Sequence, residues 1–171
     1  TVGVYATVYN SIDEEAMPEG IKALREQGAD IVIYAPHWGT EHSFDPTGQQ
    51  KELGCMAIDA GADIVYGCHP HVLQPIEEYK DGVIFYSLGN FAFGGNIYPS
   101  DYDTAIIQQE ITLEADGTVV LGQRNIIPCS LSSMANRNNY QPTPYEAGSA
   151  EYNRVLSKLD GTYDGPNLPV H

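Results

Sequence analysis

His69 and His71 flank Pro70 directly after the apolar run ADIVYG, which is typical of a buried strand. Residues two positions apart in an extended segment face the same side, and Pro70 favours an extended backbone. We therefore expect the two imidazoles to face one centre. Imidazole is a common metal ligand in proteins, so this spacing predicts a metal site.

A third histidine, His37, ends a run that resembles the one before His69. GADIVIYAPH at residues 28–37 and GADIVYGCHPH at residues 61–71 both begin with Gly-Ala-Asp and end in histidine. In open α/β sheets, ligands bind at the carboxyl ends of the strands, where both runs place their histidines. A lone histidine at a strand end is usually a hydrogen-bonded or surface residue. Three at one edge predict a cluster of the type that suits Zn, Fe, Mn or Ni.

Other polar residues adjoin this predicted edge. Glu41, in HWGTEH, is placed to orient a histidine, bind a second metal or form a surface salt bridge. Asn90 follows the strand-like GVIFYSL and either presents its amide to the same cavity or is an ordinary turn residue. We expect Cys68 to be a buried structural thiol that points into the sheet packing. His42 and His171 are expected to be solvated.

The strand-like runs that must position these side chains alternate with helix-like segments. EEAMPEGIKALREQ at residues 14–27 and DPTGQQKELGCMAIDA at residues 45–60 carry apolar residues at helical spacing. Gly28 and Gly61 follow these segments, as residues just beyond a helix C-terminus often do. The order strand, helix, strand, helix, strand predicts a βαβαβ unit of the α/β class with parallel strands.

The chain changes character after this unit. DGVIFYSLGNF at residues 81–91 and the longer run at residues 104–128 are typical of antiparallel or mixed strands, with a hairpin turn at Ala115–Gly117. We therefore assign residues 1–129 to one structural unit. Residues 130–171 are predicted to form a loop-rich tail with one short helix.

Within this tail, the Ser-, Asn- and Pro-rich residues 130–150 are typical of a loop, and AEYNRVLSKL predicts the helix at residues 150–159. The last residues, 160–171, are expected to fray.

Composition limits the classes of function. Lys and Arg number 8 against 23 Asp and Glu, a formal charge of −15, which disfavours binding to nucleic acid and to anionic lipid. No apolar run reaches the ~18 residues of a membrane span. The chain opens on TVGVYAT without an initiator Met, so we expect a fragment of a larger protein.

Three motifs in order, APHWGTE, GADIVYGCHPHVLQPIE and VIFYSLGNFAFG, resemble the poly-γ-glutamate capsule biosynthesis proteins of the CapA type, in the calcineurin-like metallophosphoesterase superfamily. The resemblance covers roughly residues 28–95. It implies a bacterial protein at the cell surface or outside the cell, membrane-anchored upstream, that takes part in making or exporting poly-γ-glutamate. It also implies a metallophosphoesterase-like half-sandwich.

By the same resemblance, His37 corresponds to an isolated metal-binding histidine, and His69 and His71 correspond to the paired histidines of a two-metal centre. The metals implied are Mn, Zn or Fe. Glu41 and Asn90 are candidate catalytic residues that would hold substrate or orient a ligand.

The superfamily takes its other ligands from Asp-x-His, Gly-Asp and Gly-Asn-His motifs, none of which precedes His37 in this sequence. We therefore expect the C-terminal half of a catalytic domain, incomplete as an enzyme, whose partners are the upstream half and also poly-γ-glutamate or membrane synthase subunits. The alternative is a non-catalytic assembly or scaffold module of the capsule machinery. An amidohydrolase barrel is disfavoured because it needs eight βα units.

Overall fold

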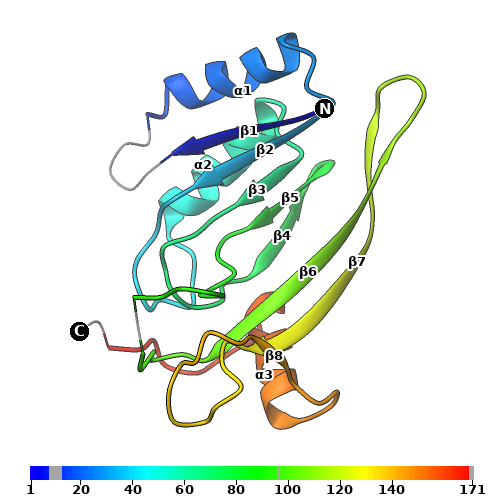
Figure 1. The fold of residues 1–171 in the computed structure, drawn as a ribbon. Coiled ribbons are helices and arrows are strands. Elements are labelled where there is room, and N and C mark those ends of the chain that lie inside the picture. The colour runs from blue at the N-terminus through cyan, green and yellow to red at the C-terminus, as the bar shows by residue number, and fades with distance from the viewer. Residues whose placement is uncertain (8–12, 96, 170–171) are drawn as a thin grey trace.

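Two sheets make up the fold in the computed structural model, which describes residues 1–7, 13–95 and 97–169 (Figure 1). The larger sheet has the strand order β1-β2-β3-β5-β4, and its first four strands run parallel. Its strands are β1 (Val2–Thr7), β2 (Ile31–Pro36), β3 (Ile64–Tyr66), β4 (Ile76–Tyr79) and β5 (Gly82–Phe85). The βαβαβ unit predicted from the sequence is confirmed. The antiparallel edge strand β4 was not predicted.

Two helices cover one face of this sheet, α1 (Ala16–Glu26) and α2 (Gly48–Asp59). Their apolar residues pack on the sheet in one core, which includes Met17, Ile21, Val32, Tyr34, Leu53 and Ala57. A capping box starts α2, because Thr47 and Gln50 bond each other's backbone N–H groups. Gly28 and Gly61 have φ angles of 87° and 110°, as expected for residues that end helices.

A long hairpin lies across part of the other face (Figure 1). It consists of β6 (Asp103–Leu113) and β7 (Val119–Ser130), joined by the predicted turn, and the short β8 (Thr143–Pro144) pairs with β7. Helix α3 (Ala150–Asp160) packs against the hairpin through Val155 and Leu159. The helix predicted at residues 150–159 is therefore confirmed.

The expected fraying of residues 160–171 is wrong for the described part of that segment. Residues 163–169 run back along the loop that follows β2, and the backbone N–H of Leu168 donates to the carbonyl of His42 at 3.1 Å. The prediction was wrong because it used only the local content of Gly, Pro and polar residues. Local composition carries no information about contacts with a distant part of the chain. Val170 and His171 lie outside the described residues.

On the sheet face that the hairpin covers in part, β1 and β2 remain largely uncovered. Val4, Ile33 and Ile64 lie in one row across the sheet; Ile64 is buried under the hairpin, Ile33 is half-buried and Val4 is 56 % exposed. Val2 and Tyr66 are also exposed. Within the described ranges, no element covers the exposed side chains of Val2, Val4 and Tyr66, which together form an apolar strip. In the same ranges, no helix is both long enough and apolar enough to cross a membrane.

Candidate metal centre

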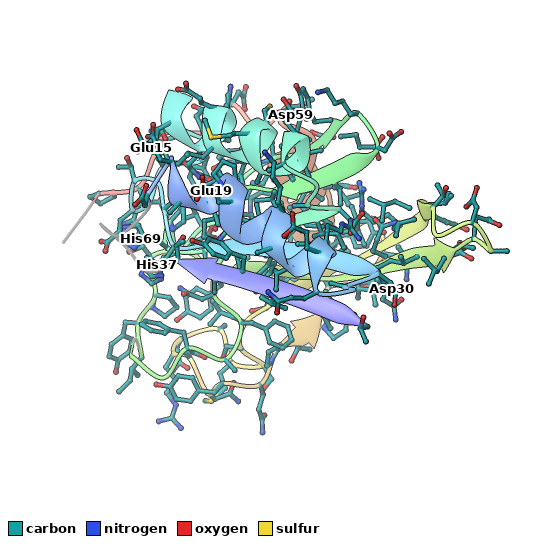
Figure 2. The ribbon with its side chains drawn as sticks, turned by 90° about the horizontal axis from the view of Figure 1, so that it is seen from above. Glu15, Glu19, Asp30, His37, Asp59 and His69 are labelled. Carbon is teal, nitrogen blue, oxygen red and sulfur yellow. The ribbon has the colours of Figure 1, made fainter. Side chains whose placement is uncertain are left out.

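The histidines lie where β2 and β3 end, because the pairing of these strands continues beyond them. Cys68 donates its backbone N–H to the carbonyl of Pro36, and Trp38 donates to the carbonyl of Cys68, both at 3.0 Å. This pairing holds His37 beside the segment that carries His69. Figure 2 shows the two rings together at one edge of the sheet.

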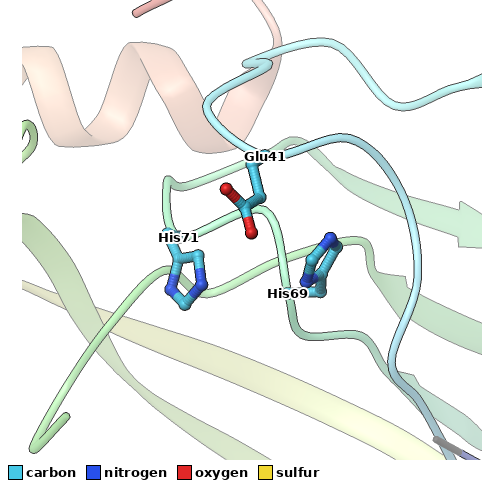
Figure 3. A group of neighbouring side chains, drawn as sticks. All are labelled: Glu41, His69 and His71. Carbon is cyan, nitrogen blue, oxygen red and sulfur yellow. The ribbon is translucent and has the colours of Figure 1, made fainter. Parts of the chain in front are cut away.

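Glu41, His69 and His71 form a compact group at this edge. Each offers one ligand atom, and these atoms all lie within 4.8 Å of one another. Figure 3 shows the Glu41 carboxylate directed toward the space between the two rings. Two imidazoles and one carboxylate are a donor set that suits Zn²⁺, Fe²⁺ or Mn²⁺. The residues present therefore fit a divalent metal ion.

The two paired histidines converge by a route that the sequence did not predict. The expected extended backbone is wrong, since His69 and His71 have positive φ angles of 107° and 59°. The segment turns at each histidine, and the ring centroids end 6.0 Å apart. Such φ angles are uncommon for residues other than glycine and are held here by the surrounding contacts.

His37 stands beside His69 but outside the group of three. Its Nε2 lies 2.9 Å from Nδ1 of His69, and the ring centroids are 4.6 Å apart. Its Nδ1 lies 3.4 Å from the Cys68 thiol. Cys68 therefore does not simply point into the sheet packing as expected, because its position opposite His37 brings sulfur and ring together. Burial raises the pKa of Cys68, which keeps the thiol protonated.

Asn90 contacts His71 rather than standing as a plain turn residue. The amide oxygen of Asn90 lies 2.8 Å from Nδ1 of His71. An amide oxygen only accepts, so Nδ1 carries the proton and Nε2 of the neutral ring is left with its lone pair. This is the usual support of a metal-binding histidine by an outer partner.

Electrostatics favours the neutral form of His69. Burial lowers the pKa of His69, and the neighbouring His37 lowers it further, while the Glu41 carboxylate acts in the opposite direction. Neutral imidazole is the form that binds a metal ion.

A buried pair of glutamines supports the loop that carries Glu41. Gln74 donates to the backbone carbonyls of Ser43 and Asp45, and it accepts a hydrogen bond from Gln50 at 2.8 Å. Both glutamine side chains are almost fully buried. Sequence reasoning missed them, although Thr47 and Gln50 have the spacing of a capping box and could have been noticed.

His42 was expected to be solvated; it is half-buried and is also held by hydrogen bonds to distant parts of the chain. Its ring Nδ1 lies 2.7 Å from the carbonyl of Pro169, and its backbone N–H donates to Pro70 at 2.8 Å. The distance of 127 residues between His42 and Pro169 explains why local composition gave no sign of the contact.

A cavity of about 210 Å³ adjoins the cluster. It is lined by Glu41, His42, His71, Asn90, Phe93, Gly95, Pro99, Ser100 and Asp101. None of these residues is Lys or Arg. Positive charge for an anionic ligand would therefore have to come from a metal ion or from outside this lining. A larger hollow of about 620 Å³ at the other edge of the sheet includes none of the predicted site residues.

Comparison with known proteins places these features in a family context. The family described as bacterial capsule synthesis protein PGA_cap matches residues 3–95, which include all five predicted site residues. The PGA biosynthesis protein CapA of Bacillus subtilis is 38 % identical over 131 residues, covering 77 % of this chain and 31 % of the relative.

The capsule biosynthesis protein CapA of Bacillus anthracis is 40 % identical over 138 residues, covering 81 % of this chain and 30 % of the relative. A probable polyglutamine synthesis accessory protein of Mycobacterium tuberculosis is 34 % identical over 61 residues, covering 36 % of this chain and 16 % of the relative. The chain spans about a third of the length of the two CapA relatives.

Proposed function

The chain belongs to the bacterial capsule synthesis protein PGA_cap family, as a CapA-type protein, and from this premise we propose that it holds a divalent metal ion for hydrolytic chemistry in poly-γ-glutamate capsule biosynthesis. The convergence of Glu41, His69 and His71 carries the proposal. Their ligand atoms come from two separate loops and all lie within 4.8 Å of one another.

In this proposal Glu41, His69 and His71 hold the ion, which is Mn, Zn or Fe, and His37 is a further ligand or supports His69. When bound, such an ion polarises a phosphoryl or carbonyl oxygen and lowers the pKa of water. The chain's own residues prepare the site: Asn90 fixes the ring of His71, and burial keeps His69 neutral.

Metal titration of matched variants tests this proposal. We expect the chain to bind Mn²⁺ or Zn²⁺ in calorimetric titration, and Glu41→Ala and the double variant His69→Ala/His71→Ala to lose that binding. Glu110→Ala, which removes a carboxylate from the distant hairpin, should bind as the parent chain does. Equal metal content in all four proteins would remove the basis of the proposal.

We further propose that upstream residues complete the site. A two-metal hydrolytic centre normally uses several carboxylates, one of them bridging. Among the described residues, the candidate cluster contains one, Glu41. The exposed apolar strip at Val2, Val4 and Tyr66 supports a second layer that the upstream half would supply.

The isolated chain is then expected to bind at most one metal ion and to show little phosphoesterase activity. A longer protein that restores the upstream half should bind two. Two tight sites on residues 1–171 alone would show that the chain carries its own second set of ligands.

The second candidate function is a non-catalytic assembly or scaffold module, which the single carboxylate and the open apolar strip also favour. One assay distinguishes the two candidate functions, namely hydrolysis of p-nitrophenyl phosphate by the longer protein in the presence of Mn²⁺, Zn²⁺ or Fe²⁺. Hydrolysis with any of these metals supports the hydrolase. Absence of hydrolysis with every metal supports the scaffold module.

We also propose a location and partners for the chain. The names of the capsule relatives support an association of this chain with the cell envelope, and we propose the cell surface or the extracellular side, with a membrane anchor upstream. Poly-γ-glutamate and membrane synthase subunits are the proposed partners. An anionic polymer would be repelled by a chain of charge −15, so a bound metal ion would mediate the contact.

A further inference from the structure

We propose that residues 163–169, which follow α3, act with His42 as a clamp that positions the Glu41 carboxylate. The inference rests on the proposed metal site, because Glu41 is one of its three ligands. The family match ends at residue 95, so residues 163–169 lie outside the matched region, while His42 lies inside it.

His42 links three parts of the chain directly next to Glu41. Its backbone N–H donates to Pro70, which lies between His69 and His71, at 2.8 Å. Its carbonyl accepts from Leu168 at 3.1 Å. Its ring Nδ1 lies 2.7 Å from the Pro169 carbonyl, which can only accept, so the ring donates this bond. The tail thus reaches both ligand-bearing loops through one residue.

Phe44 provides the second attachment of the tail to this loop. Its backbone N–H donates to the side-chain oxygen of Asn167 at 2.9 Å. Its ring packs edge-on against Tyr163, with the centroids 4.8 Å apart. Phe44 is only 6 % exposed, so the Phe44 side of these contacts is sheltered from water, while Asn167 is exposed. Hydrogen bonds and an aromatic contact therefore fix the backbone that directly follows Glu41, at His42 and at Phe44.

The clamp has a rigid base in a buried lysine. Lys158 of α3 places its ammonium 4.7 Å from the Phe44 ring centroid and 5.3 Å from that of Tyr163. The same ammonium pairs with Asp101 and Asp103, each at 2.7 Å. Asp101 also lines the cavity beside Glu41. The ammonium group of Lys158 therefore contacts the loop through Phe44, the tail through Tyr163 and the cavity wall through Asp101.

The inner side of the loop is held independently by Gln74, which bonds the carbonyls of Ser43 and Asp45. Loss of the tail should leave this inner support in place. The loop would then stay folded, while the backbone around Glu41 would become more mobile. A metal ligand that is less well positioned binds more weakly, and loss of such outer support typically costs 10- to 100-fold in affinity.

Three variants of the 171-residue chain and one control variant test the clamp with Co²⁺ as the probe. A chain that ends at Pro166 lacks all three tail hydrogen bonds but keeps Tyr163 on Lys158. Asn167→Ala removes one bond, and Asn167→Asp keeps an accepting oxygen at the same place. Asn153→Ala is the matched control, since Asn153 bonds Gly148 on the exposed side of α3.

Two readouts are taken: amide hydrogen exchange of residues 40–46, and the visible absorption of bound Co²⁺. The chain ending at Pro166 should exchange faster in residues 40–46 alone and bind Co²⁺ about 10- to 100-fold more weakly, with an altered spectrum. Asn167→Ala should weaken binding about 2- to 10-fold, as expected for one hydrogen bond. Asn167→Asp should restore parent behaviour, and Asn153→Ala should not differ from it.

Unchanged exchange in residues 40–46 of the shortened chain would overturn the clamp, as would faster exchange spread over the whole chain. Faster exchange confined to residues 40–46 together with unchanged Co²⁺ affinity would also overturn it, because Glu41 would then not depend on the tail. Local loosening in a protein whose parent chain binds no Co²⁺ would support the clamp on the loop and refute the proposed metal function instead.

Discussion

The hydrogen bond between Asn90 and His71 decides which ring nitrogen of His71 can act as a ligand. Asn90 accepts from Nδ1 at 2.8 Å, so Nε2 is the nitrogen with the free lone pair. Without this partner the ring can rotate or bear its proton on the other nitrogen. The contribution of Asn90 is therefore orientation of the ring.

We predict that Asn90→Leu weakens Mn²⁺ or Zn²⁺ binding about 10- to 100-fold, because it removes the acceptor that holds the His71 ring. Asn90→Asp retains an accepting oxygen and should bind within a few-fold of the parent chain. Calorimetric titration of both variants gives the comparison. If Asn90→Leu and Asn90→Asp bind equally well, the hydrogen bond has no role in the site.

The site residues that the sequence predicted correctly as neighbours were those whose positions depend on strand ends. His37, His69 and His71 follow strands of one parallel sheet, and parallel strands bring their carboxyl ends to one edge. Glu41 was only a candidate, because its place depends on side chains far along the chain. Its neighbour His42 reaches Pro169, and local patterns hold no information on such a contact.

At the scale of elements, α3 is attached to β6 of the smaller sheet by an ion network centred on the buried Asp103. Asp103 is fully buried and receives hydrogen bonds from Arg154 at 2.7 and 2.8 Å and from Lys158 at 2.7 Å. Burial alone would raise the pKa of Asp103, but Arg154 and Lys158 outweigh it, and the pKa is lowered. The folded state therefore holds Asp103 ionised more strongly than the unfolded chain does.

The lowered pKa of Asp103 predicts the direction in which stability changes with pH. The Asp103 carboxylate stabilises the fold above the usual aspartate pKa of about 3.9, and this contribution is lost as the pH falls through the lower folded-state value. Asp103→Asn should reduce the free energy of unfolding by about 1.5–3 kcal/mol at pH 7, since Arg154 loses its carboxylate and Lys158 keeps only Asp101. Below about pH 4 the difference from the parent chain should shrink.

Urea unfolding between pH 3 and pH 7 measures this difference. Asp81→Asn, in the exposed turn before β5, is the control and should follow the parent chain closely. A constant gap between Asp103→Asn and the parent at every pH would show that packing, not charge, accounts for the loss.

The end of β3 is packed too tightly for any side chain at Gly67. A Cβ there would lie 2.2 Å from the Tyr86 carbonyl and 2.3 Å from Nε1 of Trp38, which are hydrogen-bonded to each other at 2.9 Å. We predict that Gly67→Ala lowers the free energy of unfolding by about 1–3 kcal/mol in urea. Gly48→Ala in the first turn of α2 meets no atom within 4 Å and should be neutral or stabilising. Equal stability of the two variants would contradict this account.

Some helices and strands form because of local sequence signals, whereas others depend on contacts with distant parts of the chain. The two helices and three parallel strands could be predicted because apolar spacing and the terminal glycines Gly28 and Gly61 are local signals. The edge strand β4 was missed because IEEY is short and half polar, and only its pairing with β5 makes it a strand. The ordered tail was missed for the same reason, since its contacts lie with residues 42–44.

At the scale of the whole molecule, the larger sheet is covered unevenly. Along the row from Ile64 through Ile33 to Val4, burial falls from nearly complete to less than half. Apolar strips of this kind on a sheet face commonly mark contact with another layer. The sequence correctly predicted strands with apolar residues on both faces. It could not say which face the described chain leaves open.

The last prediction tests whether upstream residues cover this strip. Val4 is 56 % exposed, so Val4→Lys should change the free energy of unfolding of the 171-residue chain by no more than about 0.5 kcal/mol. In a longer protein whose upstream half packs on the strip, the same lysine would be buried without a partner and should cost several kcal/mol. Leu113→Lys, at a similarly exposed site near the hairpin turn, should be tolerated in both proteins. Urea midpoints of the four variants decide the matter: if Val4→Lys is as harmless in the longer protein as in the short one, the upstream half does not cover this face.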